Sequence, residues 1–280
     1  MANPPDGGLA GLRGEGSPRP FLGSREVAPI RCGAVADERP RLSVVIPCYN
    51  EELRLPRTIE RIERYLGARG DRYELILVDD GSGDGTRKVM EDTAARNKSI
   101  RVAALPVNRG KGRALAEGVK VSRGDYVLVT DADLSTPIEE LPKLEAALAA
   151  GAGVAIGSRA IKGSRVELSQ PIYRVLMGKA FNIIVQLVLL PGIWDTQCGF
   201  KLFRGDIAHD VFAGLTTDGF GYDPEVLYLA KKKGVPIAEV PVVWRNSAPT
   251  KVNAIRSSLD MFRHVVRIRF RHRALSAAPR

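Results

Sequence analysis

The chain has 280 residues, a formal net charge of +10, three cysteines and three histidines. Three cysteines do not make a disulfide framework, and a chain with so few histidines and no C-x-x-C pair is not expected to hold a structural zinc ion. The sequence shows no signal peptide at its start, and no apolar run is long enough to span a membrane.

The positive charge is concentrated at one end of the chain. Residues 251–280 contain eight Lys/Arg and one Asp, so they hold +7 of the total charge of +10. Such a segment attracts anionic surfaces of lipid or nucleic acid. The rest of the chain has no basic stripe and no nucleic-acid-reading motif, so no nucleic-acid partner is expected. Residues 1–40 are rich in Gly, Pro and Arg and are predicted to be a disordered tail, which leaves one domain at residues 41–250.

Apolar runs alternate with helical patterns over residues 42–157. Runs rich in β-branched residues are typical of strands buried on both faces of a parallel sheet. Their alternation with helices indicates βαβ units, so we expect an α/β fold with a mostly parallel central sheet flanked by helices. The predicted strands cover residues 42–47, 74–78, 100–105, 127–130 and 153–157, and the predicted helices cover about 53–68, 86–97, 113–122 and 137–150.

Polar side chains follow each predicted strand at the point where it ends. Because ligands bind beyond the carboxyl ends of the strands in such sheets, these side chains are expected to converge. Asp131 and Asp133 follow an apolar run and point to the same side of an extended chain. Two carboxylates at this spacing suit Mg²⁺ or Mn²⁺ bound together with the phosphates of a substrate. An isolated Asp-x-Asp run is more often a simple turn.

The second half of the chain is less regular. Residues 172–190 are predicted to form a helix so apolar that it belongs either in the core or at a membrane surface. A loop from residue 195 leads into a strand, residues 218–225 open a helix that ends near residue 233, and a last strand is expected over 237–244.

Residues 254–272 are predicted to form a basic amphipathic helix. Arginines flank or oppose an apolar face that consists of Ile255, Leu259, Phe262, Val266 and Phe270. This pattern is typical of an interfacial helix that binds anionic lipid. The alternative is a solvated helix that docks on the domain.

Five motifs in a fixed order give the sequence a family resemblance. They are Ser43–Glu52, Val78–Ser82, Asn108–Gly112, Asp131–Ser135 and Gly157–Arg159. Together they resemble family-2 glycosyltransferases of the GT-A fold, over roughly residues 42–250. Within that family the chain looks like the branch that transfers glucose or mannose to dolichyl phosphate. The block Asp195–Lys201 is most similar to the glucosyltransferases of this branch.

The resemblance implies a Rossmann-like GT-A sheet and assigns a role to each motif. Asp131 and Asp133 would hold the metal on the diphosphate of the donor, with Ala132 between them. Ser135 stands where mannosyltransferase relatives often carry Gln. Arg159 would meet a phosphate of donor or acceptor. The nucleoside pocket would be lined by Pro47, Tyr49, Glu51, Val78 and Asp80, and basic residues near the diphosphate would be Arg245 and Lys251. Lys111 and Arg109 are further cations that could offset the charge of a phosphate acceptor.

The chemistry depends on the acceptor. A phosphate acceptor is largely ionised at pH 7 and needs cations such as Arg159 rather than a general base. An alcohol acceptor would need a base close to its proton, and Asp195 could serve. Asp80 has an alternative role as a helix cap, and Lys111 has one on a solvated helix face. Asp223 and Glu225 either cap the helix that follows Pro224 or line the mouth of the acceptor site.

The resemblance implies an inverting transfer of a hexose, glucose from UDP-glucose, to a dolichyl or polyprenyl phosphate by a protein peripheral on the cytoplasmic face of a membrane. Alternatives are mannose from GDP-mannose, or a sugar-alcohol acceptor in cell-envelope polysaccharide synthesis. A nucleotidyltransferase is disfavoured because the loop after the first strand is acidic, and a Rossmann dehydrogenase because G-x-G-x-x-G is missing there.

Overall fold

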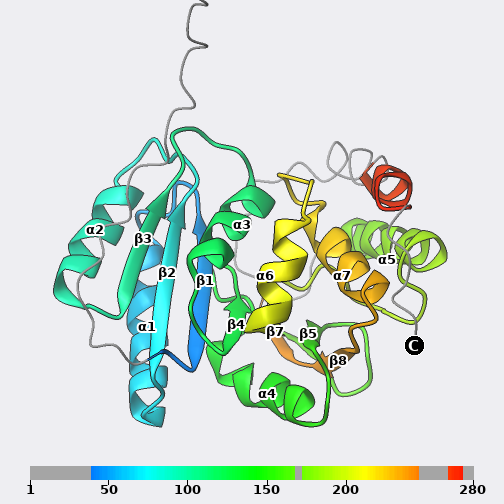
Figure 1. Ribbon diagram of the computed structural model, residues 1–280, viewed down its shortest axis with the longest axis horizontal. Coiled ribbons are helices and arrows are strands. Elements are labelled where there is room, and N and C mark those ends of the chain that lie inside the picture. The colour runs from blue at the N-terminus through cyan, green and yellow to red at the C-terminus, as the bar shows by residue number, and fades with distance from the viewer. Residues whose placement is uncertain (1–38, 168–171, 246–263, 274–280) are drawn as a thin grey trace, which may run out of the picture.

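The computed structural model describes residues 39–167, 172–245 and 264–273. Its centre is a seven-stranded sheet with the order β3-β2-β1-β4-β7-β5-β8 (Figure 1). All neighbouring strands are parallel except β7, which runs antiparallel to both β4 and β5. The predicted mostly parallel α/β sheet is therefore confirmed. The strands are β1 (Leu42–Cys48), β2 (Tyr73–Asp79), β3 (Ile100–Ala104), β4 (Tyr126–Val129), β5 (Val154–Ser158), β7 (Lys201–Arg204) and β8 (Ile237–Pro241).

Both faces of the sheet are covered, so its strands are apolar on both sides. Val45 and Val127 share one buried cluster with residues of α3, α6 and α7, whereas Val44 and Leu128 share another with residues of α1 and α4. Alternate residues of a strand point to opposite faces, which explains this division. The helices are α1 (Leu55–Arg69), α2 (Thr86–Arg96), α3 (Lys111–Val121), α4 (Leu141–Ala149), α5 (Ile172–Val188), α6 (Gly205–Ala213) and α7 (Tyr222–Lys232).

Two features of the second half differ from the sequence prediction. Helix α6 was not predicted, because its nine residues are too few for a clear helical period. The expected strand over 237–244 is two strands, since β8 ends at Pro241 and β9 (Val243–Arg245) pairs with β6 (Arg165–Glu167) in a separate small sheet. Proline has no N–H for a ladder hydrogen bond, so the chain leaves the main sheet there.

The sequence left open whether helix α5 lies in the core or at a surface, and the structure gives it one buried face and one exposed face. Phe181 and Val185 are buried in the core, whereas Ile183 is 56% exposed and Leu187, one turn further on, is 82% exposed. Figure 1 shows α5 at the end of the molecule that also carries the last helical segment, residues 264–271. None of the helices in the described ranges is long and apolar enough to cross a membrane.

Residues 264–271 dock on the domain by one face. Val265 and Ile268 are buried in the same cluster as residues of α7, and His272 contacts Glu225 of that helix at 2.7 Å. Phe270 stays 67% exposed. The segment is therefore helical and docked, and it still presents an apolar side chain to solvent. Residues 254–263 of the predicted helix lie outside the described ranges.

Candidate active site

The loops that follow β1, β2, β4 and β5 meet at the carboxyl ends of these strands, and β7 begins at the same place. This edge of the main sheet, formed by strand ends, is the candidate site. The strand register fixes this meeting, because Lys201 pairs with both Val129 at the end of β4 and Ile156 in β5. An antiparallel strand begins where its parallel neighbours end. The sheet therefore brings residues of β7 to the edge where the sequence predicts the ligand.

Side chains tie the loops after β1 and β2 to each other. The backbone N of Asn50 donates to Ser82 Oγ at 3.0 Å, and Gly83 N donates to Asn50 Oδ1 at 2.8 Å. Asn50 has a left-handed φ of 55°, a conformation that asparagine tolerates better than most residues. Glu51 N donates to Thr86 Oγ1 at 2.7 Å. The loop that carries Tyr49 and Glu51 is thus held in one shape.

Some of the residues predicted to line the nucleoside pocket do not direct their side chains toward this edge. Tyr49, in the loop after β1, is 44% exposed. Val78 is fully buried in the core, against Gly118 of α3, where an added Cβ would lie 2.8 Å from Val78 Cγ2. Its side chain cannot line a pocket, because it lies on the α3 face of the sheet. Ala132 likewise points into the core cluster beneath α1.

Asp80 holds the loop that precedes α3. Its carboxylate accepts hydrogen bonds from Arg109 N at 2.7 Å and Gly110 N at 2.8 Å. Burial raises the pKa of Asp80, although these two amides oppose the shift. Gly110 has φ 104° and packs against the Asp218 carbonyl, a position that excludes a side chain. Asp80 is therefore a loop anchor in this structure and not a helix cap.

Asp131 and Lys111 form the charged centre of the edge. Lys111, the first residue of α3, makes an ion pair with Asp131, so it does not belong to a solvated helix face. Burial works against ionisation of Asp131, but the charge of Lys111 outweighs it and lowers the Asp131 pKa. Gly199 packs so closely on the Asp131 carboxylate that a Cβ there would clash with it. Asp131 is thus ionised and fixed in place.

Asp133 is held by the turn that follows β4. Its Oδ1 accepts a hydrogen bond from Ser135 N at 2.8 Å, and Leu134 between them has a strained φ of 45°. Burial, followed by the charge of Asp131, raises the Asp133 pKa. A cation between the two carboxylates would relieve this repulsion, so the pair fits a divalent metal. The described ranges contain no group of three or more His, Cys, Asp or Glu that could hold a metal ion.

Arg159 and Asp195 form a two-point ion pair at the end of β5. Arg159 Nε lies 2.7 Å from Asp195 Oδ2, and Arg159 Nη2 lies 2.8 Å from Asp195 Oδ1. The guanidinium also lies 5.3 Å from the ring of Trp244. Asp195 is 1% exposed, and although burial opposes its ionisation, the charge of Arg159 lowers its pKa. Both of its oxygens are engaged, which does not suit a general base.

Lys201 is a site residue that the sequence prediction missed. The side chain is fully buried, makes an ion pair with Asp223 and donates to the Cys198 carbonyl at 2.5 Å. Its ammonium lies 5.8 Å from the Tyr222 ring, which is also 5.5 Å from Lys111. A lysine flanked by the apolar Phe200, Leu202 and Phe203 was the available signal. Asp223 therefore pairs with a buried lysine and is not a simple cap.

The remaining predicted residues lie at the rim or beyond it. Ser135 is buried, and its carbonyl accepts a hydrogen bond from Arg245 N at 2.7 Å. The Arg245 side chain turns to Glu167 of the small sheet, at 2.7 Å. The Arg245 side chain therefore pairs with Glu167 and is directed away from Asp131 and Asp133. Lys251 lies outside the described residues.

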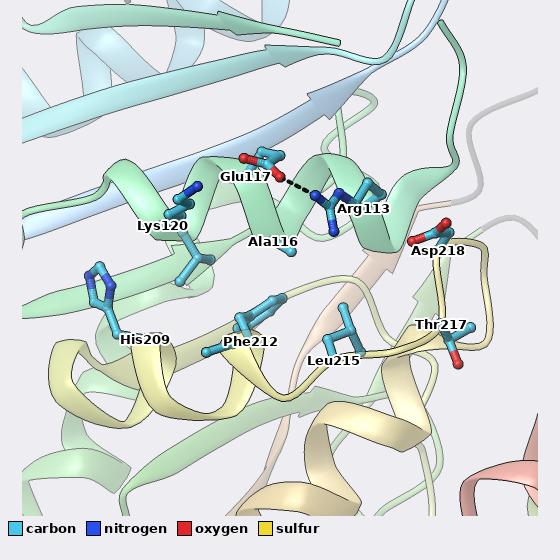
Figure 2. Close-up of a pocket in the computed structure, with 11 residues that line it drawn as sticks. Arg113, Ala116, Glu117, Lys120, His209, Phe212, Leu215, Thr217 and Asp218 are labelled. Atoms are coloured by element: carbon cyan, nitrogen blue, oxygen red, sulfur yellow. Dashed lines mark ion pairs between the residues drawn. The ribbon is translucent and has the colours of Figure 1, made fainter. Parts of the chain in front are cut away.

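Two cavities adjoin this region. A depression of about 410 Å³ lies beside Asp133 and is lined on the α1 side by Arg54, Arg57 and Arg61. The second cavity, of about 490 Å³, lies between α3, α6 and the loop to Asp218, as Figure 2 shows. Its lining includes the Arg113–Glu117 ion pair but none of the predicted site residues. The depression beside Asp133 is therefore the one that borders the predicted site.

The fold and this edge define a nucleotide-sugar transferase of the GT-A class, and comparison with known proteins agrees. Residues 43–212 match glycosyl transferase family 2. The chain belongs to this family and is a glycosyltransferase. Glucosyl-3-phosphoglycerate synthase from Mycobacterium tuberculosis, in complex with Mn²⁺ and UDP-glucose, has a similar fold with a TM-score of 0.57 at 22% identity, over 81% of this chain and 77% of that one.

Two curated relatives show which branch of the family the chain is similar to. The chain is 38% identical over 245 residues to the dolichyl-phosphate beta-glucosyltransferase of Homo sapiens, which covers 83% of this chain and 76% of that protein. It is 37% identical over 243 residues to the protein of the same name from Dictyostelium discoideum, over 82% of this chain and 74% of the relative. The predicted family and branch are confirmed.

Proposed function

We propose that the protein transfers glucose from UDP-glucose to the phosphate of dolichyl or another polyprenyl phosphate, with inversion at the anomeric carbon. The names of the curated relatives support glucose and the dolichyl phosphate acceptor, and the solved structure with UDP-glucose supports the donor. The observation that carries the proposal is the buried Asp195–Arg159 pair, which presents a permanent cation at the edge of the sheet that also holds Asp131. A site for two phosphorylated substrates needs such a group.

Asp131 and Asp133 would hold a Mg²⁺ or Mn²⁺ ion. When bound, this ion neutralises charge on the nucleoside diphosphate as it leaves. The solved relative that contains Mn²⁺ and UDP-glucose supports a divalent metal. Lys111 holds Asp131 ionised, and Ser135 N holds the rotamer of Asp133, so both carboxylates are prepared as ligands. Pro47, Tyr49, Glu51 and Asp80 would surround the nucleoside.

Arg159 would bind the phosphate of the acceptor. Asp195 occupies Nε and one hydrogen of Nη2, so other N–H groups of the guanidinium remain for a phosphate. A phosphate acceptor is ionised at neutral pH and attacks without a general base. The role that fits Asp195 is therefore to hold Arg159, and the fully paired carboxylate argues against an alcohol acceptor.

The protein would work at the cytoplasmic surface of a membrane, where a polyprenyl phosphate displays its headgroup. The exposed Ile183 and Leu187 of α5 support this, as does the exposed Phe270 beside exposed arginines on the last helix. Apolar side chains flanked by basic residues are typical of interfacial contact with anionic lipid.

One assay tests the proposal. The protein is incubated with Mg²⁺ or Mn²⁺ and radiolabelled UDP-glucose or GDP-mannose, with and without polyprenyl phosphate, and the lipid is extracted. We expect label from UDP-glucose in the lipid phase only when polyprenyl phosphate is present. Lipid label from GDP-mannose alone would overturn the choice of sugar, and label that stays in the aqueous phase would overturn the acceptor. The variant Asp92→Asn, a change at an exposed ion pair on α2, is the matched control for changes at Asp133.

A further inference from the structure

Glu239 of β8 joins the two segments that build the Arg159 site. Its Oε1 accepts hydrogen bonds from Ser158 Oγ at 2.8 Å and from Asp195 N at 2.8 Å. Its Oε2 accepts one from Trp194 N at 2.9 Å. Ser158 ends β5 directly before Arg159, and Trp194 and Asp195 belong to the loop after α5. One carboxylate therefore fixes both partners of the Arg159–Asp195 pair.

The chemistry of these contacts requires a carboxylate. All three partners donate hydrogens, and a carboxylate is an acceptor at both oxygens. A glutamine could accept at its oxygen, but its NH₂ would face an N–H donor. Asp195 and Ser158 are almost fully buried, so an amide or hydroxyl left unsatisfied there would be costly.

The order of contacts runs from Glu239 to the Asp195 backbone, and from the Asp195 carboxylate to Arg159. Asp195 also accepts from Arg159 N at 2.9 Å, so the loop and the end of β5 are joined twice. Among the described residues, the Arg159 guanidinium contacts Asp195 and the Trp244 ring rather than Glu239. Glu239 can therefore affect phosphate binding only by way of Asp195 and the backbone.

We propose that Glu239 is a positioning residue for the acceptor: it holds the Trp194–Asp195 loop against β5 so that Arg159 faces the acceptor phosphate. The proposal rests on the proposed function and adds a residue to it. Glu239 acts on the acceptor side alone, because its partners lie on β5 and the loop after α5, whereas Asp80 and Lys111 are held by other contacts.

The test is the steady-state kinetics of Glu239→Gln with UDP-glucose and polyprenyl phosphate. We expect the KM for polyprenyl phosphate to rise about tenfold, as for the loss of one hydrogen bond to a charged group, with the KM for UDP-glucose unchanged. Equal effects on both substrates, or no effect on either, would overturn the proposal.

A double-mutant cycle with Asp195→Asn separates positioning from a general loss of structure. If Glu239 acts through Asp195, Glu239→Gln has little further effect on the acceptor KM once Asp195 is changed. Full additivity of the two changes would contradict the proposal. Glu145→Gln is the matched control, since Glu145 is a half-buried glutamate that also accepts several hydrogen bonds, from Arg41 and Arg69, away from this edge. It should leave both KM values unchanged.

Wild-type turnover distinguishes failure of this inference from failure of the proposed function. If the wild type glucosylates polyprenyl phosphate and the kinetics of Glu239→Gln do not change, only the positioning role is wrong. If the wild type does not use polyprenyl phosphate at all, the proposed function is wrong. In that case the cycle is run with the acceptor that the assay identifies, and an additive result would still reject the role of Glu239.

Discussion

Asp131 and Asp133 are two residues apart, yet their surroundings shift their pKa values in opposite directions. Both are penalised by burial, but Asp131 has Lys111 as a partner, whereas Asp133 faces the charge of Asp131. Asp131 is thus paired directly with a cation. The charge of Arg54 favours ionised Asp133 but does not offset burial and the charge of Asp131, so a divalent cation would stabilise the ionised pair.

The variant Asp133→Asn should therefore gain stability while losing activity. Because the folded pKa of Asp133 is raised above its unfolded value, its contribution favours folding at low pH and is lost as the pH rises through the folded pKa. Asparagine keeps the acceptor for Ser135 N without the charge. We expect a higher melting temperature at pH 7 without metal, measured by calorimetry, and transfer reduced at least about a hundredfold. Unchanged turnover would exclude the metal role.

Arg159→Lys tests the two-point pair at the end of β5. A lysine ammonium cannot bind Asp195 through two parallel N–H groups and still present further donors to a phosphate. We expect kcat/KM for polyprenyl phosphate to fall about 10- to 100-fold, the loss expected for one or two charged hydrogen bonds, with little change in the affinity for UDP-glucose by calorimetric titration. An equal loss of donor affinity would instead assign Arg159 to the diphosphate.

At the scale of elements, α5 and the last helix each have one buried face and expose apolar side chains on the other, Ile183 and Leu187 on α5 and Phe270 on the last helix. Leu187→Ser and Phe270→Ser together should weaken binding to anionic vesicles without lowering the melting temperature, because neither side chain is in the core. Co-sedimentation with vesicles measures the effect. Leu53→Ser is the matched control, since Leu53 is 92% exposed on the loop before α1. A similar loss for the control would mean that the contact is not specific to these helices.

The attachment of the last helix to α7 depends on pH in a defined direction. Glu225 accepts hydrogen bonds from Thr216 and Thr217 and contacts His272, and although burial opposes its ionisation, these contacts lower its pKa. Its contribution to stability is therefore complete above the ordinary glutamate pKa of about 4.3 and is lost as the pH falls through the lower folded value.

Glu225→Gln should accordingly destabilise the protein by about 1–3 kcal/mol at pH 7, the cost of leaving buried donors unsatisfied. The difference in free energy of unfolding between this variant and the wild type should shrink as the pH falls below about 4. Denaturant titrations at several pH values measure it, with Glu117→Gln on α3 as the control. A difference that does not depend on pH would show that the charge of Glu225 is not what stabilises the contact.

At the scale of the whole molecule, charge is distributed unevenly, since residues 251–280 hold +7 of the +10. Attraction between exposed charges and a membrane is screened by salt. Binding to vesicles that contain anionic lipid should therefore weaken several-fold between about 0.1 and 0.5 M salt, while binding to neutral vesicles stays weak throughout. Salt-independent binding to both would assign the membrane contact to apolar side chains alone.

The sequence predicted the parallel half of the molecule well, because each strand there is a local apolar run with a loop after it. It also predicted that Asp131, Asp133 and Arg159 would lie at strand ends. Periodicity and motifs are local signals, and each of them describes one continuous segment of the chain. The small sheet of β6 and β9 had no such signal, because each strand has only three residues and β6 is exposed along its whole length.

The errors within the site have the same cause. The family resemblance predicted that Val78 lines the nucleoside pocket. The direction of its side chain is instead set by the pleat of β2 and by packing against α3. Lys201 and Glu239 were missed because their partners, Asp223 and the Trp194–Asp195 backbone, are distant in sequence. A buried charge is recognisable only once its partner is known.

The antiparallel strand β7 also bears on how the enzyme is made. It is the third strand from the β8 edge of the main sheet, between β4 and β5, although both are synthesised before it. Until residues 201–204 pair, the edge of β4 is open, and the segments with Asp131 and Arg159 have nothing to hold them side by side. Pairing of β7 with both strands is therefore what joins the ends of β4 and β5 at one edge. A partly synthesised chain that ends before β7 contains Asp131, Asp133, Arg159 and Asp195 but lacks the strand that joins β4 to β5.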